Sequence, residues 1–358
     1  MRVCILGHGL SSLTLAKALV NQNIYVDIIT YKKNQKIGLS RTLGISKSNI
    51  NFFNKNIINI EKLLWRLKKI EIFTDNLKNE KLLNFERSND QIFSIIQNYE
   101  LHQIIEKDLL KSKYFKKRYF KNNDSSFLKD YNLIINCNYL NTFTNKYFSK
   151  KIIKEYDSIA YTTIISHEKI INNTATQIFT KKGPLAFLPI SNKKTSIVYS
   201  VHNSLKKVND INELIKQYNL KYKINKIGKI ENFELRSLNL RSYYHKNILA
   251  FGDLLHKIHP LAGQGFNMTI RDIKMLLKII KNKLDLGLEL DSSVNKEFEK
   301  NVKYKNFIFS NGVDLIHEFF NYERKTKNSV ISKSIQILGK NSSANKVFIK
   351  IADEGIFF

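Results

Sequence analysis

The segment that decides the fold reads GDLLHKIHPLAGQGFNMTIRD, from Gly252 to Asp272. It follows an apolar run, Ile248–Phe251, that is typical of a buried strand, and it precedes a long segment with helical apolar periodicity. Between them lie an acid at the strand end, a proline, and turns of small residues at Ala262-Gly263 and Gly265. The pattern predicts a turn whose backbone N–H groups and helix N-terminus face a negatively charged ligand.

A second turn of this kind opens the chain. Arg2–Leu6 is an apolar run typical of a strand, and Gly7-His8-Gly9-Leu10-Ser11-Ser12 follows it directly, before a helical pattern. Gly7 and Gly9 allow a tight turn and a close approach to a pyrophosphate, and Ser12 is small enough to keep helix and strand together. Alone, a G-x-G-x-x-S motif is weak evidence, and an ordinary strand–helix turn is the alternative. The strand before it and the helix after it favour dinucleotide binding.

The order of the remaining elements predicts two domains. A βαβ unit closes at Ile24–Thr30, short alternating runs from Ile159 predict antiparallel strands, and the chain after Asp272 is mainly helical. The expected fold class is therefore α/β, with a Rossmann-like nucleotide-binding domain interrupted by an antiparallel β-sheet substrate domain and followed by C-terminal helices. The expected boundaries are 1–70, 98–150 and 240–300 for the first domain, 71–97 and 151–239 for the second, and 301–358 for the helical segment.

Finer expectations concern the part of the chain after Thr30. We expect a loop carrying Arg41, helices over Ser46–Phe53 and Glu61–Lys68, and a small strand excursion before residue 98. The connection from Lys111 to Asp130 looks too short for the set of strands that is usual in such a domain.

The formal net charge of +28 raises the question of a nucleic-acid ligand. The basic residues are mostly lysines spread along the whole chain, so a solvated lysine surface is the leading interpretation, with attraction to anionic lipid headgroups as the second. No apolar run reaches the ~18 residues of a membrane-spanning helix, and the start of the chain lacks the pattern of a signal peptide. We therefore expect a cytoplasmic protein in which Cys4 and Cys137 are small buried residues.

Several single residues are candidates for ligand binding. Asp253 follows a buried strand directly, so its carboxylate is expected at the sheet edge where ligands of open α/β sheets bind; a turn or N-cap aspartate is the alternative. Thr30 stands where a ribose-binding acid is usual, and its hydroxyl offers a weaker hydrogen bond. His256 and His259 lie three apart without a third ligand at sensible spacing, so we expect no metal site. His8 is expected to be a solvent-facing turn residue.

These motifs resemble the flavoprotein monooxygenases of the p-hydroxybenzoate hydroxylase type, and especially their ubiquinone-biosynthesis hydroxylase branch. Besides the glycine turn, RTLGIS at Arg41–Ser46 resembles that branch's R-A-x-A-L-S segment, and FTKKGPLAFLP at Phe179–Pro189 resembles its F-T-x-x-G-P-L-A-x-L-P hairpin. Gly252–Asp272 resembles its G-D-A-A-H-x-x-H-P-x-A-G-Q-G-x-N-x-G-x-R-D block at most positions. The last two motifs are highly specific.

The resemblance implies an FAD-dependent aromatic-ring hydroxylase that uses O2, through a flavin hydroperoxide, to hydroxylate a polyprenylated phenol in ubiquinone biosynthesis. The cofactor-binding residues it implies are Gly7, Gly9, Ser12, Thr30, Arg41, Asp253, Gly263, Gly265 and Asn267. The residues implied beside the reacting flavin ring are Pro260, Gly263, Gln264 and Gly265. The residues implied to wall the substrate pocket are Gly183, Pro184, Leu185, Phe187 and Pro189.

One departure from the pattern leaves the electron donor and the activity open. The D-G pair of the second nucleotide motif is replaced by Asn138-Tyr139, so the electron donor, NAD(P)H or another, stays open. The same departure favours the alternative of a non-catalytic flavin-fold subunit of a quinone-synthesis complex. A further alternative, a flavin-dependent isoprenoid reductase, shares the fold but fits the hairpin less well. A polyprenyl substrate would also imply peripheral contact with the inner membrane, and no nucleic-acid partner is expected.

Overall fold

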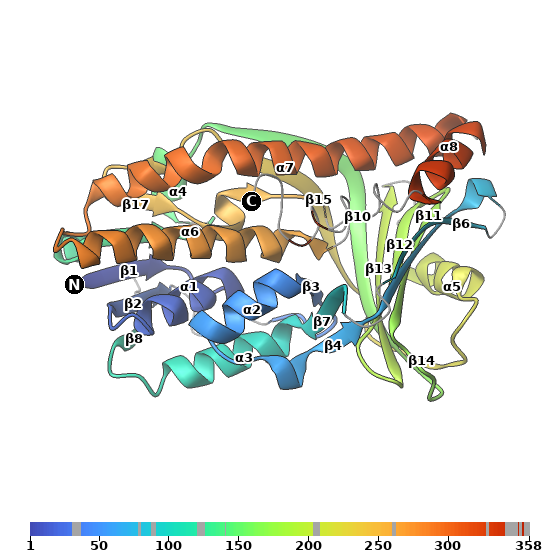
Figure 1. The fold of residues 1–358 in the computed structure, drawn as a ribbon, viewed down its shortest axis with the longest axis horizontal. Coiled ribbons are helices and arrows are strands. Elements are labelled where there is room, and N and C mark those ends of the chain that lie inside the picture. The colour runs from blue at the N-terminus through green and yellow to red at the C-terminus, as the bar shows by residue number, and fades with distance from the viewer. Residues whose placement is uncertain are drawn as a thin grey trace.

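The computed structural model describes residues 1–30, 37–77, 80–86, 91–119, 126–139, 141–202, 208–259, 263–326 and 329–340, together with positions 350 and 353. Over these residues the chain forms a mainly parallel sheet, a large antiparallel-rich sheet and a small sheet between them, and the long helix α7 runs along the molecule past both larger sheets (Figure 1). The expected α/β fold class, with a Rossmann-like sheet, an antiparallel sheet and C-terminal helices, is confirmed.

The first sheet has six strands in the order β16-β17-β9-β1-β2-β8. All neighbours pair in parallel except β16 with β17. The strands are β1 (Arg2–Leu6), β2 (Tyr25–Thr30), β8 (Phe115–Tyr119), β9 (Leu133–Asn136), β16 (Tyr244–His245) and β17 (Ile248–Ala250). The helices of this part are α1 (Leu10–Val20), α3 (Asn98–Leu109), α4 (Thr142–Tyr147) and α6 (Gly265–Asp285).

The core of this part consists of the apolar β-strands and the buried faces of α1, α3 and α6, whose side chains form one continuous cluster. The 111–130 connection, which looked too short for the usual strands of such a domain, does contain one strand, β8, which extends the sheet beside β2. Its sequence, FKKRY, buries only Phe115 and carries three basic residues, as an edge strand can.

The large sheet has nine strands, eight of them in the order β18-β15-β10-β13-β12-β11-β5-β6, while β14 pairs with β10. Its helix α5 (Val208–Tyr218) lies on the side away from the parallel sheet (Figure 1). The strands are β5 (Lys69–Thr74), β6 (Lys81–Glu86), β10 (Lys151–His167), β11 (Thr174–Thr180), β12 (Gly183–Pro189), β13 (Lys194–His202), β14 (Ile224–Ile227), β15 (Glu231–Leu240) and β18 (His256–Lys257).

A third sheet lies between the other two and consists of β3 (Thr42–Ser46), β7 (Phe93–Gln97) and β4 (Trp65–Leu67), all antiparallel. Helix α2 (Lys47–Asn56) follows β3, as expected. The predicted helix over Glu61–Lys68 is wrong: a single 3-10 turn at Glu61–Leu63 leads into β4, whose pairing with β7 overrides the local helical pattern. The loop expected at Arg41 continues at once into β3.

The C-terminal helices are α7 (Ser292–Thr326) and α8 (Ser329–Lys340). The boundary expected at residue 300 falls inside α7, and the domain limits remain a prediction. Among the described residues, no helix combines the length and apolar character needed to cross a bilayer.

Candidate functional site

Three turns lie side by side at the carboxyl edge of the parallel sheet. The backbone pairing of the strands continues into them, so that each turn is tied to the neighbouring strand. The three hydrogen bonds, each of 2.9 Å, run from Gly7 N–H to Ile29 O, from Cys137 N–H to Leu6 O, and from Phe251 N–H to Asn136 O. The sheet therefore brings together the glycine turn, the Asn138-Tyr139 segment and Asp253, which are remote in sequence.

The glycine turn leaves the start of helix α1 accessible to a ligand. Gly7 has a φ of +115°, a conformation that strongly favours glycine, and a Cβ there would lie 3.4 Å from Ser12 Oγ. Gly9 is the N-cap of α1, and a Cβ there would meet no atom of the described residues within 4 Å. In the part of the chain that the structure describes, no side chain caps α1, and its first turn contains no acid. The first N–H groups of α1 are thus arranged as a phosphate would require.

Another glycine-containing turn, Gly263-Gln264-Gly265, lies at the start of helix α6 and also leaves the N-terminus of its helix without a side-chain cap among the described residues. Gly263 has a φ of +62°, and a Cβ there would lie 3.2 Å from the backbone nitrogen of Gly44 in β3. Gln264 is 4% exposed, and within the described residues its Oε1 has no hydrogen-bond partner. Helix α6 also lacks a side-chain cap and a first-turn acid. Pro260 lies outside the described residues, so its place beside a ring remains a prediction.

Asn267, on the first turn of α6, holds this turn against β3 and α2. Its Oδ1 accepts from Ser46 N–H at 3.0 Å and from the Asn49 amide at 2.9 Å, and its Nδ2 donates to Gly44 O at 2.9 Å and to Gly263 O at 3.4 Å. Protein groups therefore satisfy the hydrogen-bonding capacity of both the oxygen and the nitrogen of this side-chain amide. We accordingly propose that Asn267 positions the turn, in place of the expected direct contact with a cofactor.

Replacing Asn267 with Leu is expected to lower the free energy of unfolding by about 3 kcal/mol, because buried groups of Ser46, Asn49 and Gly44 lose their partner. Chemical denaturation measures this loss. The matched control is Asn301→Ala, which removes an exposed intrahelical hydrogen bond and should change stability by less than about 0.5 kcal/mol. Equal effects of the two substitutions would contradict the positioning role.

Asp253 lies in the expected place, exposed in the 3-10 turn Gly252–Leu254 that follows β17. Charged and phenolic side chains surround it. The Tyr139 hydroxyl donates to the Asp253 backbone oxygen. The pKa of Lys257 is lowered, mainly by burial, with Asp253 opposing the shift and the Arg236 and Arg41 guanidinium groups adding to it. The pKa of the Tyr139 phenol is raised, again mainly by burial.

The sequence did not single out Tyr139, Lys257 or Arg236 as members of one group, because they come from three separate strands and turns. Arg41, predicted from the resemblance, is exposed and lies over the Phe233 ring of β15, with its guanidinium carbon 5.9 Å from the ring centroid. Arg41 and Asp253 thus belong to one polar group between the parallel sheet and the large sheet.

The ribose-binding acid is not supplied by strand β2. Asp27 is buried in the strand, where its carboxylate accepts from the Tyr131 hydroxyl at 2.5 Å and pairs with Arg118 at 3.1 Å and Arg2 at 3.2 Å. Thr30 ends β2 and is buried, at the edge expected for a ribose contact. Its role as a cofactor-binding residue stays a proposal.

Strand β12 presents a different face to the site from the one expected. Leu185 and Phe187 are 0% and 2% exposed and pack with Tyr199 and Ile215 in the core between the large sheet and α5. Gly183 and Pro189 fall on the same side of the strand by its alternation, and Pro184 falls on the other. Leu185 and Phe187 therefore cannot wall a pocket on the side of the parallel sheet.

The side chains of β12 that face the parallel sheet belong to the residues that alternate with Leu185 and Phe187. Ala186 pairs with Val198 of β13 and Gln177 of β11, and all three are half-buried. The same face carries Ser196, whose hydroxyl lies 2.9 Å from that of Thr42 at the start of β3. This contact places the Ala186 face opposite the segment that holds Arg41.

His256 and His259 of the Gly252–Asp272 segment have different contact partners. His256 Nε2 lies 2.6 Å from the buried Asp272 carboxylate and so ties β18 to α6. The His259 ring packs against His317 of α7 and the edge of Tyr156, and burial holds the His259 pKa well below its ordinary value. Both histidines thus contribute to packing between α6, α7 and the large sheet.

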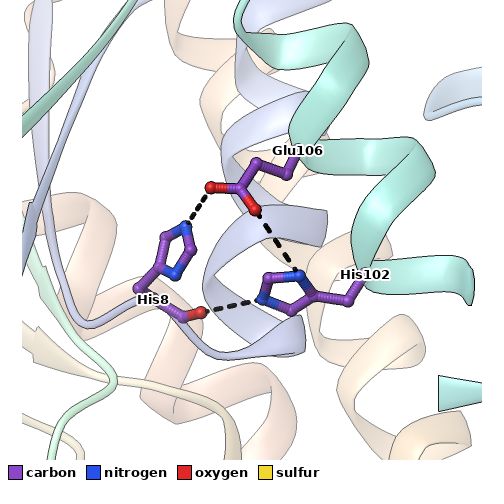
Figure 2. A group of neighbouring side chains, drawn as sticks. All are labelled: His8, His102 and Glu106. Atoms are coloured by element: carbon purple, nitrogen blue, oxygen red, sulfur yellow. Dashed lines mark hydrogen bonds and ion pairs between the residues drawn. The ribbon is translucent and has the colours of Figure 1, made fainter. Parts of the chain in front are cut away.

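His8 is not the solvent-facing residue that the sequence predicts. Its side chain is only 10% exposed, and its Nε2 lies 2.9 Å from Glu106 Oε1 on α3 (Figure 2). The partner is almost a hundred residues away in the chain, which is why the local sequence did not reveal it. Burial lowers the pKa of both His8 and the neighbouring His102.

Sequence comparison finds quinone-pathway hydroxylases. No protein-family model matches the chain. The 3-demethoxyubiquinol 3-hydroxylase of Escherichia coli is 30% identical over 152 residues, which span 40% of this chain and 39% of that protein. The mitochondrial ubiquinone biosynthesis monooxygenase COQ6 of Drosophila melanogaster is 21% identical over a gapped alignment of 394 positions, which covers 89% of this chain and 82% of that one. The match to the bacterial protein thus covers about two fifths of its length.

Structural comparison extends the similarity to nearly the whole chain. The p-nitrophenol 4-monooxygenase PnpA of Pseudomonas putida superimposes with a TM-score of 0.79 over 98% of both chains, at 10% identity. HpxO of Klebsiella pneumoniae, solved with FAD and uric acid, gives a TM-score of 0.74 over 99% of this chain and 96% of that one, at 11% identity. The chain therefore has the fold of the FAD-dependent aromatic monooxygenases and is a distant homologue of their ubiquinone-hydroxylase branch.

Proposed function

We propose that this protein binds FAD and hydroxylates the aromatic ring of a polyprenylated phenol in ubiquinone biosynthesis, with O2 as co-substrate. The observation that carries the proposal is the pair of helix N-termini at α1 and α6, neither of which has a side-chain cap or an acid in its first turn. Such ends stabilise negative charge, and FAD has a diphosphate and, when reduced, an anionic ring. The relatives' names supply the substrate class.

The residues at the carboxyl edge fit this cofactor. The Gly7–Ser12 turn would bind the diphosphate, and Asp253 and Arg41 would bind the polyol and the adjoining part of FAD. Gln264 offers a buried acceptor without a partner among the described residues, and the pyrimidine edge of a flavin carries an N–H donor that matches it. Bound FAD would supply the oxygen chemistry, and Gly263 and Gly265 would direct backbone N–H groups at the ring.

The substrate would lie between the α6 turn and the large sheet. The half-buried apolar side chains of Ala186, Val198 and Phe233 lie on strands of that sheet, and the Arg41 guanidinium covers Phe233. Apolar walls with few polar groups suit an aromatic ring that carries a hydrocarbon tail. The protein's tasks there are to orient the ring and to exclude water.

One observation favours a second candidate, a non-catalytic flavin-fold subunit. Tyr139 replaces the glycine of the second nucleotide motif, and its hydroxyl bonds to the Asp253 backbone across the carboxyl edge. A phenol ring at this place occupies space that a glycine would leave to a cofactor or a nicotinamide donor. FAD binding without turnover would be the signature of this candidate.

The decisive experiment separates binding from turnover. Purified protein is incubated with FAD, freed of excess cofactor, reduced with dithionite without air, and mixed with O2 and a prenylated phenol. We expect a yellow protein and a product that gains one oxygen atom by mass spectrometry. Chemical reduction makes the result independent of the electron donor. Yellow protein with no oxygenated product would support the non-catalytic subunit, and colourless protein would refute both candidates.

We also propose that the protein docks peripherally on an anionic membrane through helix α7. Tyr304, Leu315, Phe319 and Tyr322 are 69%, 66%, 39% and 60% exposed, and their spacing places them on one side of the helix. Helix α7 lies along an outer edge of the molecule (Figure 1). The exposed apolar side chains would contact the acyl chains of the lipids, and the net charge of +28 would attract their anionic headgroups.

The double substitution Leu315→Asp, Phe319→Asp is expected to weaken binding to vesicles of phosphatidylglycerol and phosphatidylcholine at least ~10-fold, because it removes apolar contact and adds repulsion. Vesicle co-sedimentation measures the change. The matched control is Leu220→Asp, Leu286→Asp, which alters charge equally at two leucines that are 78% and 74% exposed elsewhere. An equal loss in both variants would assign the binding to net charge alone.

A further inference from the structure

Two histidines and a glutamate meet between the glycine turn and helix α3 (Figure 2). His8 comes from the turn, and His102 and Glu106 lie one helical turn apart on α3. Their side chains are 10%, 6% and 25% exposed. One nitrogen of each histidine and a carboxylate oxygen all lie within 4.8 Å of one another. The cluster is therefore compact, partly buried and built from two segments that the fold brings together.

The hydrogen bonds of His102 decide which of its ring nitrogens is available. Its Nε2 lies 3.1 Å from the backbone oxygen of His8, and a carbonyl oxygen can only accept, so Nε2 carries the proton. In the neutral ring, Nδ1 then bears a lone pair, and Nδ1 lies 3.8 Å from Glu106 Oε2. Two acceptors that face each other repel unless a proton, a water molecule or a metal ion lies between them.

The same arrangement is the usual support of a metal-binding histidine. Such a ligand donates its second ring N–H to a backbone carbonyl, which fixes the tautomer and aims the free nitrogen at the ion. Two imidazoles and one carboxylate are a donor set that suits Zn²⁺ and similar transition-metal ions. Ligands of a tetrahedral Zn²⁺ lie about 3.4 Å apart, so small side-chain movements would bring these three into position.

We propose that His8 Nε2, His102 Nδ1 and Glu106 bind a divalent transition-metal ion of the Zn²⁺ class. Glu106 would contribute Oε2, because its Oε1 accepts from the Lys117 ammonium at 2.6 Å and from His8 Nε2–H at 2.9 Å. Binding of the ion would replace the hydrogen bond from His8 and leave the proton of that ring on Nδ1. Lys117 is the neighbouring positive charge and opposes a second cation. The ion would tie the glycine turn to α3 and leave one position for a water molecule. The site stands on this chain's own residues and needs no bound FAD.

The test titrates Zn²⁺ into the full-length, cofactor-free protein after treatment with a chelator, by calorimetry. We expect one equivalent to bind, and Co²⁺ to bind with the intense visible bands of a four-coordinate site. His102→Gln is expected to weaken binding ~100-fold or more. Lys117→Met is expected to strengthen it, because the opposing charge is gone. The isosteric Glu106→Gln keeps the bulk of the side chain and should weaken binding as well.

The matched control is His202→Gln, which removes an exposed histidine 3.7 Å from the Asp157 carboxylate on the large sheet. It should leave Zn²⁺ binding unchanged. Thermal unfolding in chelator shows that each variant is folded before titration. Absence of a stoichiometric site in the wild-type protein would overturn the proposal, and so would affinities of His102→Gln and Lys117→Met equal to that of wild type. In either case the cluster would be a hydrogen-bond network only.

Discussion

Replacing Gly9 with Asp is expected to abolish FAD binding while slightly stabilising the cofactor-free protein. Gly9 is the N-cap of α1, with an extended backbone (φ −77°) that any residue can adopt, and within the described residues a Cβ there meets no atom closer than 4 Å. An aspartate at an N-cap accepts from the helix N–H groups and opposes the helix dipole, which contributes a few tenths to about 1 kcal/mol. The same carboxylate would repel the diphosphate, by about 3 kcal/mol or more at short range.

Gly9→Asn is the matched control, because its side chain has the same shape and the same capping ability without the charge. Titration of FAD fluorescence should show a loss of at least ~100-fold in affinity for Gly9→Asp and a clearly smaller loss for Gly9→Asn. Thermal unfolding without FAD should show both variants at or above the wild-type midpoint. If Gly9→Asp bound FAD as well as Gly9→Asn, the diphosphate would not lie at this helix end.

The fold could be predicted from the sequence wherever a strand, a turn and a helix follow one another directly. The Gly7–Ser12 turn and the Gly252–Asp272 segment are of this kind, since apolar strands and glycines at fixed spacing determine local conformation. The large sheet was also predictable, because its strands alternate and its turns carry clear signals. The placement of Asp253 at the carboxyl edge followed from the strand before it.

The errors have a different physical origin, in pairings between distant segments. The Trp65–Leu67 strand forms because β7 is available beside it, and the basic β8 forms because β2 offers an open edge. Local pattern carries no information about such partners. The environment of His8 likewise depends on Glu106, almost a hundred residues away. Sequence reasoning therefore placed His8 in solvent.

The most consequential error of the sequence prediction was the choice of Leu185 and Phe187, on the wrong face of β12, as walls of the substrate pocket. A hairpin motif shows that a strand lines a site, but a strand has two faces, and a shift of one residue exchanges them. Leu185 pairs with Ile178 and Tyr199, both of which pack against the α5 side, so its own side chain must face α5. Only the register of the neighbouring strands reveals this, and it assigns the opposite face to Ala186.

This assignment predicts opposite effects for two adjacent residues. Ala186→Trp should lower the affinity for a prenylated phenol ~100-fold or more, because the indole would occupy the proposed pocket, while FAD affinity and stability change little. Leu185→Ala should lower the free energy of unfolding by about 2–5 kcal/mol, since it empties a fully buried position, and should leave substrate affinity within a few-fold. Denaturant unfolding measures the stability of both variants, and substrate-induced changes in flavin absorbance measure their affinity for the prenylated phenol.

The two variants together test the orientation of the strand, because each is the control of the other. Pocket-facing residues control affinity, and residues in the core control stability, so a strand whose faces are correctly assigned separates the two readouts. A loss of substrate affinity in Leu185→Ala, together with normal affinity in Ala186→Trp, would reverse the assignment. The pocket wall would then be the α5 side of the sheet, and the aromatic substrate would lie too far from the Gly263–Gly265 turn for a flavin bound there to hydroxylate it.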